Sequence, residues 1–310
     1  MTVIVFSHQI GRQHRKSCLV KDPVHQDKFE YHLSRLFKNA DDRAHYRTLI
    51  MQLWSRVHQF LSPQHEVKQR PYPAIIGISG AQGTGKTTLA NLLVKYAQLQ
   101  GVAAGSISLD DYYLSQSKRT ELAVQIHPLL LMRGMPGTHH IEQAISDAKA
   151  VLKGQPICLP HFDKALDQPS APRALQSFDL LIVEGWFLGL TSQTLEQLRP
   201  CVNDLELAED QNLRWRQFVN QQLALNYQEY WKLCQPMIFL QAPDWASICR
   251  WRAKQEQQLF QLRGKGMTAA QLERFMQSFQ RLTEHSFRVM PTSSDIVIEL
   301  DHQQRPTIVR

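Results

Sequence analysis

The fold is decided by the stretch Ala74-Ile75-Ile76-Gly77-Ile78-Ser79-Gly80-Ala81-Gln82-Gly83-Thr84-Gly85-Lys86-Thr87. Its first six residues are almost all apolar, which is typical of a strand buried on both faces. Its last eight match the pattern G-x-x-x-x-G-K-T, and a helix is expected to follow over residues 87–100. A strand, a glycine-rich turn and a helix in this order form a phosphate-binding loop, because the turn and the helix N-terminus point backbone N–H groups at phosphate oxygens.

The loop predicts a site for ATP or another nucleoside triphosphate, together with Mg²⁺. We expect Lys86 to reach the β and γ phosphates and the Thr87 hydroxyl to coordinate magnesium. The residues expected to hold the nucleotide are Gly80, Ala81, Gln82, Gly83, Thr84, Gly85, Lys86, Thr87 and Thr88.

Apolar strands and helices alternate along the chain after this loop. Further strands are expected at residues 105–109, 180–183, 236–240 and 295–300, and further helices at 141–153, 209–233, 244–262 and 268–289. Continuous apolar strands separated by helices indicate a parallel sheet covered on both faces. The sequence therefore predicts an α/β protein: a P-loop NTPase fold of three layers, α/β/α, with a mainly parallel sheet.

An N-terminal helical extension and linker is expected over residues 1–70, before the main domain at 71–310. Phe29, Leu33, Leu53 and Val57 belong to two runs of apolar residues at helical spacing. Residues 62–73 carry three prolines and little periodicity, which indicates a linker.

Composition limits the classes of partner. The chain has 310 residues, of which 43% are hydrophobic and 20% charged, so it can bury a core. The net charge is +7, but the basic residues are scattered rather than gathered in one tract, so no nucleic-acid partner is expected. No run of about 18 apolar residues exists, so no membrane span is expected.

Cysteine usage indicates a reducing compartment. The five cysteines are an odd number, and no two have C-x-x-C spacing, so neither a zinc site nor a disulfide framework is indicated. Free thiols and the lack of an export signal predict a cytoplasmic protein. The sequence does not determine the oligomeric state.

Carboxylates follow two of the expected strands. Asp110 and Asp111 come directly after residues 105–109, and Glu184 comes directly after residues 180–183. Ligands of open α/β sheets bind outside the carboxyl ends of the strands, where such residues can serve magnesium or accept a proton. The alternative for each is a helix cap or a solvated turn.

The chain resembles the plant-type D-glycerate 3-kinases and their bacterial and fungal relatives over about residues 73–310. Besides the phosphate loop, the matching motifs are D-D-Y-Y at 110–113, R-G-M-P-G-T-H at 133–139, L-P-x-F-D-K at 159–164 and V-E-G-W at 183–186. More distantly, the pattern is similar to uridine kinase, phosphoribulokinase and bacterial pantothenate kinase. The resemblance implies an ATP-dependent kinase that phosphorylates a hydroxyl of a small anionic metabolite, with D-glycerate as the first candidate.

The resemblance also implies roles for individual residues. Asp110 matches the base toward the acceptor hydroxyl, and the implied catalytic set is Lys86, Asp110, Glu184 and Arg252. The implied magnesium ligands are Thr87, Asp110 and Glu184. The implied acceptor-binding residues are Asp111, Tyr112, Arg133, Thr138, His139, His161, Asp163 and Arg173. Residues 251–267 resemble a phosphate-covering lid that carries Arg252, Arg263 and Lys265.

Other functions stay open on the residues alone. One is a nucleotide-gated regulatory or assembly protein whose N-terminal helices bind a partner, and another is a basic ATPase acting on nucleic acid. Within the kinase reading, pantothenate-like acids and nucleosides remain alternative acceptors.

Overall fold

A computed structural model of the chain describes residues 23–61, 73–264 and 266–310. Residues 1–22 of the predicted extension, residues 62–72 of the predicted linker and the predicted lid residue Lys265 lie outside the described residues, as does the side chain of Arg263. In the described part, no helix is long and apolar enough to cross a membrane.

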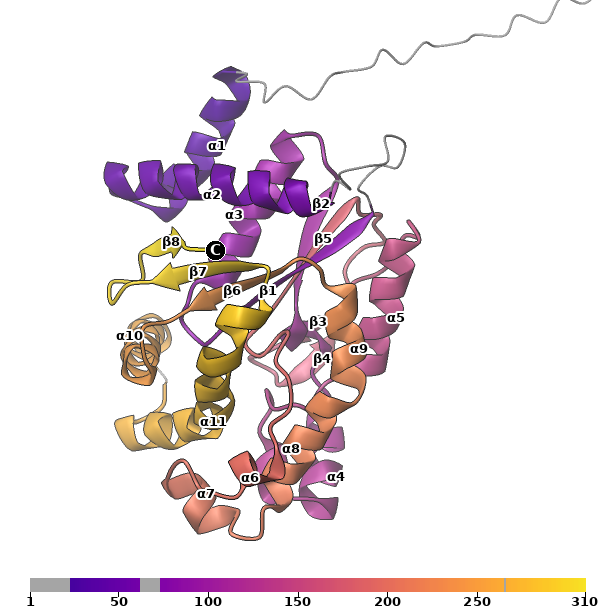
Figure 1. Ribbon diagram of the computed structural model, residues 1–310, viewed down its shortest axis with the longest axis vertical. Helices are drawn as coiled ribbons and strands as arrows, with labels where there is room; N and C mark the ends of the chain where they lie inside the picture. Colours follow the sequence, from indigo (N-terminus) through magenta and orange to yellow (C-terminus); the bar gives the residue numbers. More distant parts are fainter. Residues whose placement is uncertain (1–22, 62–72, 265) are drawn as a thin grey trace, which may run out of the picture.

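A six-stranded sheet forms the centre of the molecule (Figure 1). Its strand order is β2-β5-β1-β6-β7-β8, and only β8 runs antiparallel to its neighbour. The strands are β1 (Ala74–Gly80), β2 (Ala104–Ser108), β5 (Leu180–Gly185), β6 (Met237–Gln241), β7 (Ile296–Leu300) and β8 (Pro306–Ile308). The predicted mainly parallel sheet is confirmed; the short edge strand β8 was not predicted.

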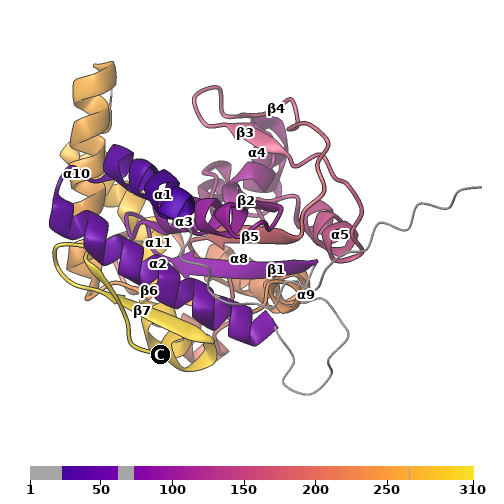
Figure 2. The ribbon, with the colours of Figure 1, turned by 90° about the horizontal axis from the view of Figure 1, so that it is seen from above.

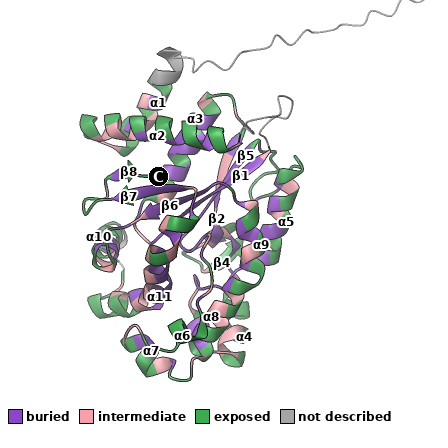
Figure 3. Cartoon of the chain, viewed as in Figure 1, coloured by how far each residue is buried: buried purple, intermediate pink, exposed green. Residues whose placement is uncertain are grey.

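The sheet is the middle of three layers. Successive residues of a strand face opposite sides of the sheet, and helices pack on both sides. Ile76 and Ile78 join a core with α3 (Lys86–Leu99), whereas Ile75 joins a second core with α5 (Ile141–Leu152). Figure 3 shows the strands buried between the two layers of helices. The predicted α/β/α architecture is confirmed.

The N-terminal helices pack on the α3 side of the sheet (Figure 2). They are α1 (Pro23–Leu36) and α2 (Ala40–Leu61). Phe29 and Trp54 contact the ring of Tyr96 from α3, with centroid separations of 5.2 and 6.1 Å. His45 Nε2 lies 2.7 Å from the carbonyl oxygen of Pro306, which ties α2 to β8. The extension therefore shares a core with the sheet.

The prediction of one helix over residues 209–233 is wrong. The segment is divided among α7 (Asp204–Glu209), α8 (Arg214–Ala224) and α9 (Asn226–Leu233). The Asp210 carboxylate accepts hydrogen bonds from the backbone N–H groups of Trp215 (2.8 Å) and Arg216 (3.1 Å). These bonds satisfy the first turn of α8, so α7 ends at its C-cap, Asp210, and a new helix begins. The backbone turns again at Leu225, where ψ is −118°.

The last two long helices are close to their predicted bounds. α10 (Trp245–Arg263) and α11 (Ala269–Ser293) lie side by side near the carboxyl ends of the strands (Figure 1). Asp244 and Thr268 cap them by accepting the backbone N–H groups of Ser247 and Gln271. α11 extends beyond its predicted end at residue 289.

Several short elements near the carboxyl ends of the strands were not predicted. They include α4 (Gln116–Gln125), the four-residue helix α6 (Leu195–Leu198), and a hairpin of β3 (His161–Asp163) and β4 (Gln168–Ser170). The Asp163 carboxylate accepts the backbone N–H groups of Ala165 (2.8 Å) and Leu166 (3.1 Å), which shapes the hairpin turn. Strands of three residues are too short to show a periodic pattern, so local sequence did not reveal them.

Candidate active site

The phosphate loop joins β1 to α3. Gly83 and Gly85 have φ values of 78° and 86°, in the left-handed region that favours glycine. Gly85 is the N-cap of α3, and no atom lies within 4 Å of where a Cβ on it would be, so the approach to the helix N-terminus is open. Thr84 Oγ1 donates to the carbonyl of Ala81 at 2.8 Å and closes the turn from inside. This geometry leaves backbone N–H groups at a helix N-terminus available to an anion.

Two side chains of the loop carry the chemistry expected from the motif. Lys86 Nζ donates to the carbonyl of Ala81 at 3.0 Å, and the Thr87 hydroxyl donates to Glu184 Oε1 at 2.9 Å. Burial lowers the pKa of Lys86, while the carboxylates of Glu184 and Asp110 oppose that shift. Thr88 follows in α3 and is partly buried. Lys86, Thr87 and Glu184 are thus brought together, as the sequence predicted.

The oxygen atoms beside Thr87 fit a magnesium ion. Mg²⁺ prefers hard oxygen ligands and is usually held by one or two protein groups together with substrate phosphates. Thr87 and Glu184 already place a hydroxyl and a buried carboxylate 2.9 Å apart at the phosphate loop. In the described residues no group of three or more His, Cys, Asp or Glu side chains could hold a metal by itself. Phosphate oxygens would therefore have to complete the coordination.

Asp110 lies in the 3-10 turn that follows β2. Its Oδ2 accepts a hydrogen bond from Lys164 Nζ at 2.5 Å, and its carboxylate also accepts one from the Tyr113 hydroxyl. Burial alone would raise the pKa of Asp110, but the Lys164 ammonium and the Tyr113 hydroxyl hold it below its ordinary value. Asp110 is therefore ionised and can accept a proton.

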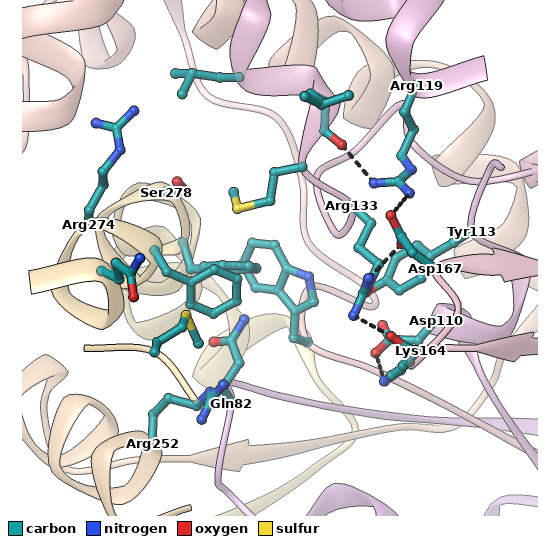
Figure 4. Close-up of a pocket in the computed structure, with 18 of the residues that line it drawn as sticks. Gln82, Asp110, Tyr113, Arg119, Arg133, Lys164, Asp167, Arg252, Arg274 and Ser278 are labelled. Carbon is teal, nitrogen blue, oxygen red and sulfur yellow. Dashed lines mark hydrogen bonds and ion pairs between the residues drawn. The ribbon is translucent and has the colours of Figure 1, made fainter. Parts of the chain in front are cut away.

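A cavity of about 980 Å³ connects these groups (Figure 4). At one end lie Gln82, Lys86, Thr87 and Glu184, and Asp110 lines the same space. Figure 4 shows the cluster around Asp110 on one side, Arg274 and Ser278 on the other, and Gln82 with Arg252 below. The apolar wall between them is formed by Leu129, Met132, Trp186, Leu205, Phe275 and Phe279. One space can thus hold both a nucleotide phosphate tail and a second molecule.

Known proteins similar to this chain are kinases, although no protein-family model matches it. It is 29% identical over 243 residues to the uncharacterized kinase mug58 of Schizosaccharomyces pombe, covering 72% of this chain and 84% of that protein. It is 24% identical over 258 residues to the chloroplastic D-glycerate 3-kinase of Arabidopsis thaliana. That match covers 76% of this chain but 54% of the plant protein, so the chain spans about half of its length.

A solved structure with the same fold is the D-glycerate 3-kinase from Cryptococcus neoformans. Its TM-score to this chain is 0.69 at 23% identity, and the match covers 84% of this chain and 98% of that one. The chain is a P-loop kinase. As a phosphotransferase, the kinase needs a second substrate beside the nucleotide, and the remaining geometry concerns where that substrate would bind.

On the side of the cavity that holds Asp110, two arginines gather around Asp167. Its two carboxylate oxygens each accept a guanidinium hydrogen bond of 2.6 Å, one from Arg119 and one from Arg133. Burial would raise the pKa of Asp167, but these two guanidinium groups lower it. Arg133 also donates to the carbonyl of Lys164 at 3.3 Å and lies over the ring of Phe162. Arg133, which the sequence predicted as an acceptor ligand, therefore lines the cavity in a fixed position.

Asp111, His161 and Arg173 are brought together, but away from the cavity lining. Asp111 Oδ1 lies 3.1 Å from His161 Nδ1, and its Oδ2 accepts from Arg173 at 3.0 Å. Asp111 Oδ2 also accepts the backbone N–H of Ser108 in a capping box. Asp163 likewise serves the hairpin turn. Of these four predicted acceptor residues, Asp111, His161 and Arg173 connect the hairpin segment to the end of β2, and Asp163 shapes the hairpin turn.

Tyr112, Thr138 and His139 are buried in the kinase rather than exposed to an acceptor. The Tyr112 hydroxyl donates to Asp147 at 3.1 Å, and Thr138 Oγ1 donates to the carbonyl of Met135 at 2.7 Å. His139 Nδ1 lies 2.7 Å from the Tyr227 hydroxyl. Burial lowers the pKa of His139 to about 3, so its imidazole is neutral. Their observed contacts shape the R-G-M-P-G-T-H loop.

Arg252 reaches the cavity from α10. Its guanidinium pairs with Glu256 at 2.7 Å and lies 5.7 Å from the ring centroid of Phe275. Glu256 in turn accepts the backbone N–H of Met267 at 2.7 Å, which ties α10 to the segment before α11. Arg252, which was predicted as a lid residue, thus lines the cavity and is linked through Glu256 to the segment before α11.

Five ionisable residues that line the cavity were not predicted from the sequence: Arg119, Tyr113, Lys164, Asp167 and Arg274. Tyr113 and Lys164 lie inside motifs already quoted, but beside the residues chosen from them. The capping pattern Ser108-x-x-Asp111 could have shown that Asp111 turns back to β2 and that Asp110 is the one left to face the cavity. Nothing local marks Arg119, Asp167 or Arg274, because they meet the site through contacts distant in sequence.

Proposed function

We propose that this kinase transfers the γ-phosphoryl group of ATP to a hydroxyl of a small anionic hydroxy acid, with D-glycerate as the first acceptor to test. The observation that carries the proposal is that one cavity joins the phosphate loop to Asp110 and Arg133. The D-glycerate 3-kinases among its relatives supply the candidate acceptor.

Asp110 would act as the general base of the transfer. As the acceptor hydroxyl oxygen forms its bond to the γ-phosphorus, the bond from that phosphorus to the β-phosphate oxygen breaks and ADP leaves. The hydroxyl proton passes to the Asp110 carboxylate. A bound Mg²⁺, held by Thr87 and Glu184, supplies charge neutralisation on the phosphate oxygens when present. Lys86 and Arg252 would stabilise the negative charge on the transferred group.

Charge in the cavity supports an anionic acceptor. The lining holds six cationic side chains and three carboxylates: Lys86, Arg119, Arg133, Lys164, Arg252, Arg274, Asp110, Asp167 and Glu184. Lys86, Arg252 and Glu184 belong to the nucleotide end, and Arg274 is paired with Glu209 outside the lining. Because Arg119 and Arg133 share the single carboxylate of Asp167, a positive excess remains on the side of the proposed acceptor. A carboxylate on the acceptor would match the planar guanidinium of Arg133.

Release of ADP in the presence of a panel of small hydroxy acids and nucleosides tests the proposal directly. We expect stimulation by D-glycerate or a related hydroxy acid. Asp110→Asn should lower turnover by about 10²–10⁴-fold while ATP binding is retained, since that is the usual contribution of a general base. Slow ATP hydrolysis that no acceptor stimulates would refute the proposal and favour a nucleotide-gated regulator.

A further inference from the structure

Before any acceptor binds, the candidate base is already engaged by a cation. Lys164 Nζ lies 2.5 Å from Asp110 Oδ2, and Figure 4 shows the two side chains meeting at the edge of the cavity. The Tyr113 hydroxyl is a second donor to the same carboxylate. The Asp110 side chain is 25% exposed, whereas that of Lys164 is 57% exposed. The ammonium of Lys164 is already largely hydrated, so Lys164 is the partner that can move away from the pair, while the Asp110 carboxylate stays in place.

Lys164 is carried by a hairpin that is anchored on both sides. On one side, His161 and the backbone N–H of Phe162 bind Asp111 Oδ1 at 3.1 and 3.3 Å. On the other, Asp167 binds Arg119 and Arg133. The turn between β3 and β4 is thus held over Asp110 by contacts that do not involve the Lys164 ammonium. The anchored hairpin, and not the ion pair alone, therefore places Lys164 close to Asp110.

Arg133 lies in the same corner of the cavity as Lys164. Its Nη2 donates to the Lys164 carbonyl oxygen at 3.3 Å. An acceptor carboxylate that reached Arg133 would therefore also come close to Lys164. In the described part of the chain, Asp110 is the one partner of the Lys164 ammonium, so a second carboxylate would compete for it directly.

We propose that Lys164 is a specificity-determining residue that masks Asp110 until an acceptor with a carboxylate takes over the Lys164 ammonium. The inference rests on the proposed function, in which Asp110 is the base. A neutral alcohol or water offers Lys164 no replacement partner, so the ion pair persists and Asp110 remains a poor proton acceptor. A carboxylate replaces Asp110 in the pair, and Asp110 becomes free to receive the hydroxyl proton.

The physical basis is the effect of a neighbouring cation on basicity. The Lys164 ammonium occupies Asp110 Oδ2 and stabilises the ionised carboxylate, so it both hinders the approach of an acceptor hydroxyl and weakens Asp110 as a base. Exchange with an acceptor carboxylate keeps the number of ion pairs constant. Asp110 then retains the Tyr113 hydroxyl as a donor, and the acceptor hydroxyl can take the place that the ammonium left. The same arrangement would suppress wasteful transfer of the phosphoryl group to water when the acceptor site is empty.

The test compares Lys164→Met with the wild-type enzyme on a charged acceptor and its neutral analogue. D-glycerate and glycerol are the probes, since glycerol keeps the hydroxyl groups and lacks the carboxylate. We expect the ratio of their kcat/KM values, glycerate over glycerol, to fall by roughly 10–100-fold, as for loss of a charge-assisted contact. Lys164→Arg should restore part of this discrimination. The matched control is Lys153→Met, an exposed lysine at the end of α5.

A second readout needs no acceptor. ATP hydrolysis by Lys164→Met without acceptor should rise by up to about 10-fold, because the base is unmasked. The rise should disappear in the double variant with Asp110→Asn. Equal hydrolysis in Lys164→Met and wild type, or an unchanged glycerate-to-glycerol ratio, overturns the inference. If no hydroxy acid stimulates the wild-type enzyme, the proposed function fails, and the hydrolysis comparison still decides the role of Lys164.

Discussion

The two arginines that share Asp167 allow a quantitative prediction, because they differ in one respect. Each donates to its own carboxylate oxygen at 2.6 Å. The side chain of Arg119 is 3% exposed and that of Arg133 is 32% exposed. At equal distance, any difference in coupling to Asp167 must come from their surroundings.

The expected magnitudes follow from burial. Exposed ion pairs contribute about 0.2–1 kcal/mol, whereas hydrogen bonds to charged groups that are shielded from water contribute about 1.5–3 kcal/mol. We therefore expect a coupling free energy of about 2 kcal/mol between Asp167 and Arg119. For Asp167 and Arg133 we expect about 0.5–1 kcal/mol. Arg119 also donates to the carbonyls of Leu114 and Leu131, but that contribution cancels in a double-mutant cycle.

The assay is urea unfolding of Asp167→Asn, Arg119→Met, Arg133→Met and the two double variants. Each cycle yields a coupling free energy from the differences among its four unfolding free energies. Asparagine keeps the shape of the carboxylate and removes its charge. Couplings that are equal, or larger for Arg133 than for Arg119, would show that burial does not set the strength of these pairs and refute the reasoning.

Three further predictions concern the phosphate loop and the core beside it. Gly85→Ala should weaken ATP binding by at least about 10-fold, measured by nucleotide titration, because a methyl group would enter the open approach to the helix N-terminus. Gly101→Ala is its control, with a similar φ of 80° and equally open surroundings but a position at the far end of α3, so it should share only the backbone cost of about 1–2 kcal/mol. Thr87→Val should raise the Mg²⁺ concentration for half-maximal activity by about 10-fold, whereas Thr88→Val should not. Finally, burial holds the pKa of His139 near 3, below its ordinary 6.5, so the unfolded chain binds a proton there before the folded one. Stability from this group is complete above pH 6.5 and falls by about 1.4 kcal/mol per pH unit below it, and His139→Gln should flatten the pH dependence of unfolding between pH 6.5 and 5.

The nucleotide side of the site could be predicted because its signals are local. Gly80 to Thr87 is one continuous segment, and Glu184 follows directly on a strand that is apolar throughout. The parallel register then brings them together, since Ile78 pairs with Glu184 across β1 and β5. The motif and the position of the strand end were therefore sufficient to predict that the phosphate loop and Glu184 lie together.

The proposed acceptor side could not be predicted to the same depth because its contacts are distant in sequence. Lys164 meets Asp110 from 54 positions away, and Asp167 meets Arg119 from 48. The D-D-Y-Y motif shows the difficulty within four residues. A 3-10 turn sends neighbouring side chains in different directions, so Tyr113 reaches the cavity while Tyr112 is buried against Asp147.

This difference between the two sides has a consequence for how the acceptor is selected. Phosphate binding depends on the loop, β1 and α3, which form part of the central core. The proposed acceptor corner depends on a surface hairpin that contributes Lys164 and Asp167 and is held by a few polar contacts. Changes in residues 161–173 can therefore alter the charge facing the acceptor without disturbing the sheet or the phosphate loop. The choice of acceptor should follow the hairpin, whereas the capacity to use a nucleoside triphosphate should follow β1 and α3.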